Sequence, residues 1–121
     1  MKNPIVAIGF ITSTCCLLLG CASQDGTLTM EQEVMRERAM NNYVDCTNSG
    51  AERLDDGKSD ALTIAKGIAS MCHSEYQQSL AASSAGLNNR ARHYFYKKMN
   101  SSQQVTNGPL NAVLLERAKH K

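Results

Sequence analysis

The stretch Ala51-Glu52-Arg53-Leu54-Asp55-Asp56-Gly57-Lys58-Ser59-Asp60-Ala61 separates two segments whose apolar residues recur at helical spacing. Asp55-Asp56-Gly57-Lys58 has the composition of a turn, and Ser59 or Asp60 is suited to cap a following helix. Because the connection is short, we expect the two helices to be antiparallel neighbours. The chain shows no alternating strand pattern of useful length, so the predicted fold is all-α.

The segments on both sides of this turn predict a helical hairpin over about 29–84. The first helix is expected to begin at Thr29 as N-cap, with Gln32 completing a capping box. The two predicted apolar faces are Met35, Ala39, Tyr43, Cys46, Gly50 and Leu54, and then Ala61, Ile64 or Ala65, Ile68, Cys72, Tyr76 and Leu80. Small residues on both faces allow the helices to approach closely.

One or two further helices are expected in the basic C-terminal region, about 88–121. Residues 82–86 are either a break or a continuation of the hairpin, and the polar residues 100–107 are expected to be a flexible connection. Pro109 suits the first turn of the last helix. The expected apolar face of that helix is Leu110, Val113, Leu114 and Ala118.

The N-terminal segment has the organisation of an export signal. Lys2 precedes an apolar run, residues 5–19, of about 15 residues, whereas a membrane-spanning helix needs about 20. The run ends in Leu18-Leu19-Gly20-Cys21, which resembles the signal peptide of a bacterial lipoprotein. The resemblance implies cleavage before Cys21 and a covalent lipid on its sulfur, with no other cofactor. An uncleaved anchor and simple secretion remain alternatives.

This resemblance also implies the domain organisation and the location. Residues 1–20 are then a cleaved signal peptide, 21–28 a lipidated N-terminus and tether, and 29–121 a small helical domain. Ala22, rather than Asp, follows the cysteine, which by resemblance to enteric lipoproteins implies the outer membrane, facing the periplasm. Loss of the signal and acylation of Cys21 leave Cys46 and Cys72, which we expect to form a disulfide in an exported chain.

The hairpin segment carries a second resemblance. Cys46, Arg53-Leu54-Asp55-Asp56-Gly57, Ser59-Asp60-Ala61, Ile64-Ala65 and Cys72 resemble the progression found in small exported bacterial helical proteins of unassigned function. The resemblance covers about 30 residues. It supports a hairpin with two cysteines and implies no catalytic residues.

Charge is divided unevenly along the expected mature chain. Residues 21–87 contain five Lys/Arg and ten Asp/Glu, whereas residues 88–121 contain seven Lys/Arg and one Glu. The basic residues Arg90, Arg92, Lys97 and Lys98, interleaved with aromatic residues, are candidates for contact with an anionic surface. Alternatively, the basic segment folds against the acidic half, binds a protein partner or is solvated. The export signal argues against a nucleic-acid partner.

The sequence contains no signature of catalysis. C-x-x-C, G-x-S-x-G, H-E-x-x-H and glycine-rich phosphate motifs are absent. Cys72-His73 lacks the ligand spacing of a structural zinc site, so no metal is expected. We therefore expect a non-catalytic interaction or structural module that binds an envelope protein. An inhibitor or immunity-type lipoprotein that binds an exported hydrolase or toxin is the alternative.

Overall fold

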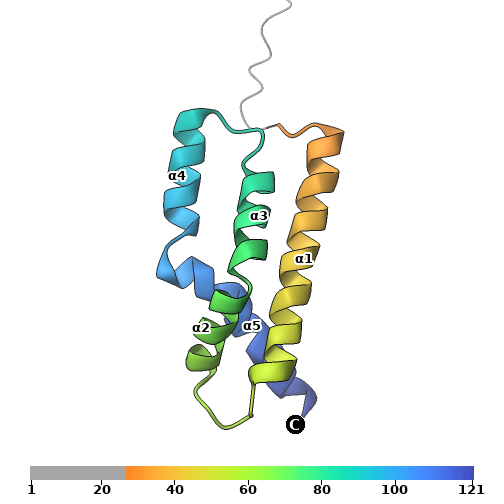
Figure 1. Ribbon diagram of the computed structural model, residues 1–121, viewed down its shortest axis with the longest axis vertical. Coiled ribbons are helices and arrows are strands. Elements are labelled where there is room, and N and C mark those ends of the chain that lie inside the picture. Colours follow the sequence, from red (N-terminus) through yellow and green to blue (C-terminus); the bar gives the residue numbers. More distant parts are fainter. Residues whose placement is uncertain (1–26) are drawn as a thin grey trace, which may run out of the picture.

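A computed structural model describes residues 27–121, and these residues form five helices and no strand (Figure 1). The predicted all-α class is therefore confirmed for this part of the chain. The expected signal peptide and Cys21 lie outside the described residues. The helices are α1 (Met30–Leu54), α2 (Ala61–Met71), α3 (His73–Ser83), α4 (Asn89–Met99) and α5 (Ser102–Lys119).

The two predicted helix starts are confirmed by their caps. At α1, Thr29 N–H donates to Gln32 Oε1 at 2.9 Å, and Gln32 N–H donates to Thr29 Oγ1 at 3.2 Å. At α2, Asp60 Oδ2 accepts from Thr63 N–H at 2.9 Å. These bonds satisfy N–H groups that have no partner inside the helix.

The turn between α1 and α2 is held by the two aspartates predicted to form it. Asp55 Oδ1 accepts from Gly57 N–H at 3.1 Å, and Asp56 Oδ1 accepts from the N–H groups of Lys58 and Ser59 at 2.9 and 2.7 Å. Gly57 has φ 68°, a left-handed conformation that glycine adopts without a Cβ clash. The chain therefore reverses direction here at little conformational cost.

The helices pack in two regions. In the upper part of Figure 1, α3 lies between α1 and α4, and α1 contacts α3. In the lower part, α5 crosses the ends of the other helices and contacts both α1 and α2. The core lies where these two regions meet.

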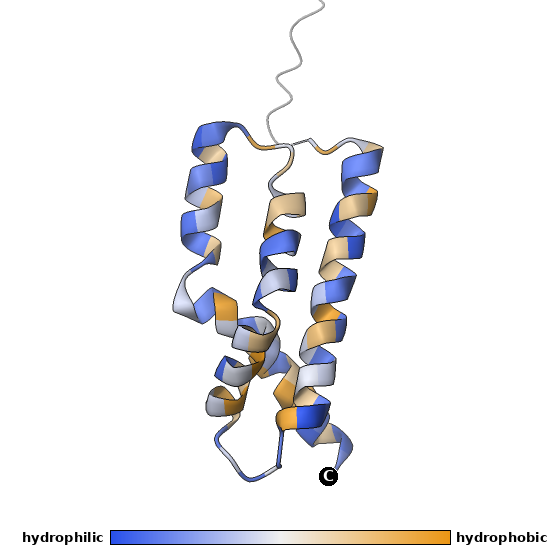
Figure 2. Cartoon of the chain, viewed as in Figure 1, coloured by the Kyte–Doolittle hydropathy of each residue, from blue (hydrophilic) through white to orange (hydrophobic). Residues whose placement is uncertain are grey.

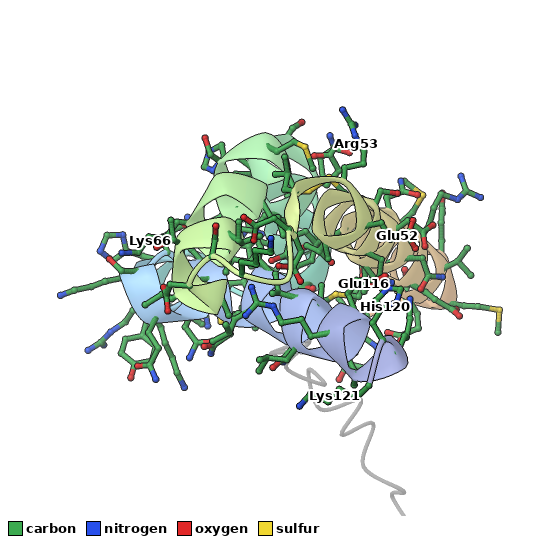
Figure 3. All side chains as sticks on the ribbon, turned by 90° about the horizontal axis from the view of Figure 1, so that it is seen from below. Glu52, Arg53, Lys66, Glu116, His120 and Lys121 are labelled. Atoms are coloured by element: carbon green, nitrogen blue, oxygen red, sulfur yellow. A yellow bond between two sulfur atoms is a disulfide. The ribbon has the colours of Figure 1, made fainter. Side chains whose placement is uncertain are left out.

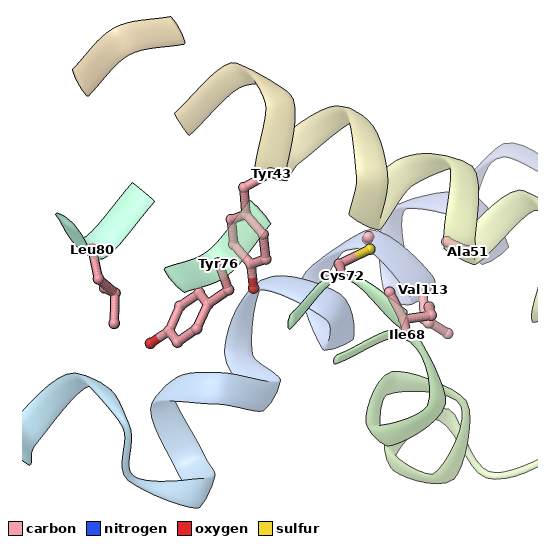
Figure 4. Packing of buried hydrophobic residues seen from close by; sticks show 8 residues of the cluster. Tyr43, Ala51, Ile68, Cys72, Tyr76, Leu80 and Val113 are labelled. Carbon is pink, nitrogen blue, oxygen red and sulfur yellow. The ribbon is translucent and has the colours of Figure 1, made fainter. Parts of the chain in front are cut away.

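This core is small and is built from four helices (Figure 4). Ile68 of α2 and Val113 of α5 are completely buried, and the rings of Tyr43 and Tyr76 pack with their centroids 5.2 Å apart. The buried cluster is Tyr43, Ala51, Ile68, Cys72, Tyr76, Leu80, Ala112 and Val113. The second predicted apolar face therefore supplies half of this cluster, namely Ile68, Cys72, Tyr76 and Leu80.

A disulfide joins Cys46, in the middle of α1, to Cys72, which lies between α2 and α3. The two Cα atoms are 5.9 Å apart, and the cysteines are 26 positions apart in the sequence. The predicted pairing is confirmed. Cys72 is completely buried, so the cross-link is part of the core.

The second helix of the predicted hairpin is divided at Cys72 rather than continuous to Leu80. Cys72 has ψ 19°, whereas an α-helix has ψ near −42°. Cys72 N–H still donates to Ile68 O, and Tyr76 N–H donates to Cys72 O. The result is a change of direction that packs α2 mainly on α5 and α3 mainly on α1.

The last helix begins at Ser102, so the prediction of a flexible connection over 100–107 is wrong. Pro109 lies inside α5 and its side chain is fully buried. Val105 also packs against the core. Burial of these two side chains compensates for the intrahelical hydrogen bond that proline cannot donate.

Four residues predicted to face the core are instead exposed, namely Met35, Leu54, Leu114 and Ala118. Met35 is 52% exposed because the first half of α1 has only α3 beside it, and α4 lies on the other side of α3 (Figure 1). In α5, the core contacts come from Pro109, Ala112 and Val113, which leaves Leu114 turned outward.

Removing the disulfide should destabilise the fold strongly. Closing a loop of 26 positions contributes roughly 3–4 kcal/mol in the chain-entropy model. The double variant Cys46→Ala/Cys72→Ala should lose about that much unfolding free energy, measured by urea denaturation followed by circular dichroism. A loss below about 1 kcal/mol would show that packing alone fixes the junction.

Two helical glycines give a matched test of how closely α1 and α2 approach. A Cβ at Gly50 would lie 2.9 Å from Cγ2 of the completely buried Ile68, whereas a Cβ at Gly67 meets only Leu54 Cδ1 at 3.9 Å. Gly50→Ala should destabilise the protein by about 1 kcal/mol, because overpacking outweighs the gain in helix propensity. Gly67→Ala should stabilise the protein by up to about 1 kcal/mol. Both changes are measured by thermal unfolding. Equal shifts of the melting temperature in the two variants would contradict the close approach of α1 to α2.

Candidate interaction surface

α4 is attached to the domain along one side only. Its residues Phe95, Tyr96 and Met99 pack against the core, but no residue of α4 is fully buried. Tyr76 Oη donates to Met99 O at 2.5 Å, and the side chain of Gln77 donates to Asn100 Oδ1 at 2.8 Å. These contacts fix the C-terminal end of α4 against α3.

The opposite side of α4 brings together two of the four predicted contact residues. At 100° per residue, Arg90 and Lys97 lie within about 20° of each other, and Tyr94 lies about 40° beyond Arg90. All three are exposed, and Tyr94 is 69% exposed. We call Arg90, Tyr94 and Lys97 the α4 outer face; Figure 2 shows how hydrophilic this helix is.

The other two predicted contact residues lie elsewhere on the helix. Lys98 is exposed at the edge of the α4 outer face. Arg92 lies toward the side that faces the domain, and its Nη2 donates to Leu87 O at 3.1 Å. The structure therefore does not form a single face from all four cations.

The positive charge of α4 has no paired carboxylate among the described residues. The ion pairs of residues 27–121 are Arg36–Glu33, Arg117–Asp55, Lys119–Glu116 and His120–Glu116. α4 contains four Lys/Arg and no Asp/Glu within its 11 residues. It is therefore a concentrated source of positive potential on the surface.

A different basic residue joins the C-terminal segment to the acidic turn between α1 and α2. Arg117 of α5 contacts Asp55 through Nη2–Oδ1 at 2.7 Å and Nε–Oδ2 at 3.0 Å, and Nη2 also donates to Ser59 O at 2.6 Å. The Asp55 side chain is only 4% exposed. The sequence alternatively predicts that the basic C-terminal segment folds against the acidic half of the chain. Arg117 does so, whereas the cations of α4 form no ion pair with it.

This contact was not found from the sequence. Asp55 and Arg117 are 62 positions apart, and neither residue belongs to a motif that names its partner. Asp55 was already explained as a turn-forming residue, so the sequence offered no reason to seek an ion-pair partner for it. Arg117 is one of seven basic residues in residues 88–121, and nothing in the sequence distinguishes it from the others. Only the crossing of α5 beneath the turn brings them together.

Both aspartates of the acidic turn have a lowered pKa. The Arg117 guanidinium beside Asp55 lowers the pKa of that carboxyl group. Hydrogen bonds from the Ser59 hydroxyl and from the N–H groups of Ser59 and Lys58 lower the pKa of Asp56 to about 2.

In the core, burial next to Tyr76 raises the pKa of Tyr43 to about 12.

The turn and the end of α5 also line a surface depression of mixed charge (Figure 3). Its charged groups are largely paired within the protein, since Glu116 contacts both Lys119 and His120. No nucleophile with an adjacent base lies among its residues, which are Glu52, Asp55, Asp56, Gly57, Glu116, Arg117, His120 and Lys121. The depression is therefore better explained by the packing of α5 on the turn than by chemistry.

The described residues lack two further features, a metal-ligand cluster and a membrane-spanning helix. Residues 27–121 contain no cluster of three or more His, Cys, Asp or Glu side chains able to hold a metal ion. Among the same residues, no helix combines the length and apolar character needed to cross a bilayer.

Comparison of the chain with protein-family models, curated proteins and solved structures found no match. The N-terminal pattern, the fold and the distribution of charge are therefore the features of this chain that bear on its function.

The acidic turn predicts a specific loss of stability in acid. A carboxyl group whose pKa is lowered by folding stabilises the fold above its ordinary pKa, 3.8, and this contribution is lost as the pH falls through about 2. Asp56→Ala should lower the melting temperature at about pH 6. The difference in melting temperature between variant and parent should become smaller toward pH 2, because Asp56 of the parent is then protonated.

Asp45→Ala is the matched control for this measurement. Asp45 is exposed on α1 and accepts no hydrogen bond from another described residue. Its difference from the parent should change little across the same pH range. An equally large narrowing for Asp45→Ala would show that general charge repulsion, and not the turn, causes the acid sensitivity.

Proposed function

We propose that this protein is a non-catalytic lipoprotein of the cell envelope, a small interaction or structural module held at a membrane by a lipid on Cys21. The observation that carries the proposal is Leu18-Leu19-Gly20-Cys21 at the end of a short apolar run that follows Lys2. A cysteine at this position supplies the thiol that the lipid needs. Ala22 after the cysteine favours the outer membrane, on its periplasmic side.

The disulfide supports export. Disulfides form and persist in oxidising compartments, and the Cys46–Cys72 bond lies inside the core rather than at a reactive surface. In the proposed mature protein, α1 and the α2–α3 pair form a hairpin that this bond closes. A small domain without tryptophan gains from such a cross-link because its core is limited.

The distribution of charge on residues 27–121 supports a binding role. α4 presents cations that form no ion pair among the described residues, on a helix attached along one side. Contact with an envelope partner through exposed side chains requires neither a metal nor another cofactor. We therefore assign the protein a binding role.

Lipidation is tested by growing cells that produce the full chain with labelled palmitate. The parent protein should carry label and fractionate with membranes, because two or more acyl chains give stable anchoring. Cys21→Ala should abolish the label. Cys16→Ala is the matched control and should keep it, since Cys16 lacks the leucine at −3 that precedes Cys21.

The proposal fails if the parent protein carries no label or if Cys21→Ala remains labelled. Immunoblotting of both variants confirms that the chain is produced. Parent protein that is unlabelled but released into the periplasm would indicate simple secretion.

A further inference from the structure

We propose that the α4 outer face, Arg90, Tyr94 and Lys97, binds the anionic phospholipid headgroups of the membrane that anchors the protein. The inference rests on the proposed function in one respect, because the lipid on Cys21 brings the bilayer close to the domain. The binding itself depends on charge and geometry that the described residues provide.

The chemistry of this face suits an anionic membrane surface. Arg90 and Lys97 are exposed on one side of α4, and Lys98 lies at its edge. Lys and Arg side chains near such a surface each contribute about 1 kcal/mol of attraction. Tyr94, 69% exposed between the two cations, is an aromatic residue with a polar tip, the kind enriched at headgroup depth.

The outer face is also free to bind. The residues of α4 that hold it to the domain, Phe95, Tyr96 and Met99, lie on its other side. No described carboxylate forms an ion pair with Arg90, Lys97 or Lys98. Binding to headgroups therefore breaks no ion pair within residues 27–121.

The chain enters the domain at the start of α1, where it packs on the loop that leads into α4. A Cβ at Gly86, in the α3–α4 loop, would lie 3.1 Å from both Thr27 O and Leu28 Cδ2, so the entering chain packs directly on this loop. α4 starts at Asn89 and is about 16 Å long. The chain from Cys21 to Thr27 reaches about 20 Å at most, so the anchor keeps α4 within reach of the bilayer.

The charge of the domain favours one orientation. α1 contains five Asp/Glu and three Lys/Arg, and it lies across α3 from α4 (Figure 1). An anionic surface therefore attracts the side with α4 and repels the side with α1. With the anchor attached beside α4, this difference turns the α4 outer face toward the membrane.

The direct test uses an unlipidated, oxidised chain of residues 22–121. This chain contains all five helices of the described residues, the disulfide and the buried cluster, so we expect it to retain the fold. The protein has no tryptophan, so Tyr94→Trp introduces a single reporter. Its emission should shift to shorter wavelength with vesicles of phosphatidylcholine and phosphatidylglycerol at low salt, and not with phosphatidylcholine alone.

Val34→Trp is the matched control reporter. Val34 is 50% exposed on α1, on the other side of the domain, so its emission should not shift. High salt should reverse the Tyr94→Trp shift because it screens the attraction. A shift of the emission of both reporters would overturn the inference that binding is specific to the α4 outer face.

Charge variants measure the contribution of the cations to vesicle affinity. Arg90→Gln/Lys97→Gln should weaken binding to the anionic vesicles by roughly 30-fold, the loss of two basic residues near the surface. Arg38→Gln/Arg53→Gln makes the same change in net charge on α1, at two exposed residues without ion pairs among the described residues. It should alter affinity by less than about threefold.

Several outcomes would overturn the inference. These are absence of binding to anionic vesicles at low salt, equal binding to neutral vesicles, or equal losses in the two charge variants. Cross-linking at position 94 in intact cells would also overturn the inference if it captured only a protein or a second copy of this chain. Because the test chain carries no lipid, absence of vesicle binding would overturn this inference without affecting the proposed lipidation of Cys21. Absence of palmitate label would overturn the lipidation without deciding vesicle binding.

Discussion

The cross-link at Cys72 is the constraint on which the arrangement of the helices depends. It fixes the junction of α2 and α3 against the middle of α1, at the point where the chain changes direction. α2 then packs on α5, and α3 packs on α1. A chain with this few large apolar residues has little other means of holding two helix directions at once, since its completely buried residues are mostly of small or medium size.

Small residues allow the same region to pack closely. Gly50 of α1 faces the side chains of Ile68 and Met71, and Gly108 of α5 lies against the ring of Tyr43, so these side chains pack directly on the backbone of the facing helix. Buried hydroxyl groups at this interface donate to carbonyls of their own helix, as Thr47 does to Val44 O and Ser79 to Tyr76 O. These two buried hydroxyl groups are thereby satisfied locally.

The charged residues divide between structure and surface. Arg117 lies over the acidic turn and joins the end of α5 to the start of α2, so this cation is part of the fold. The cations of α4 have no such partner among the described residues and remain available for binding. A division of this kind is what a tethered domain needs if it is to meet an anionic surface without losing its own ion pairs.

The disulfide was predicted from Cys46 and Cys72, the two of five cysteines that remain once the expected signal peptide and Cys21 are set aside. Local signals in the sequence determined the helical class, the caps at Thr29 and Asp60 and the turn over Asp55–Lys58. They also located the basic residues of α4, because composition is visible without a structure. Only the tertiary structure decided the bend at Cys72, the start of α5 at Ser102, the pairing of Asp55 with Arg117 and the separation of Arg92 from the α4 outer face. Caps and turns depend on hydrogen bonds within a few residues, so the sequence displays them directly. The other features depend on contacts between segments that are distant in the chain, and burial of Pro109 and Val105 there outweighs the local preference of residues 100–107 for a loop.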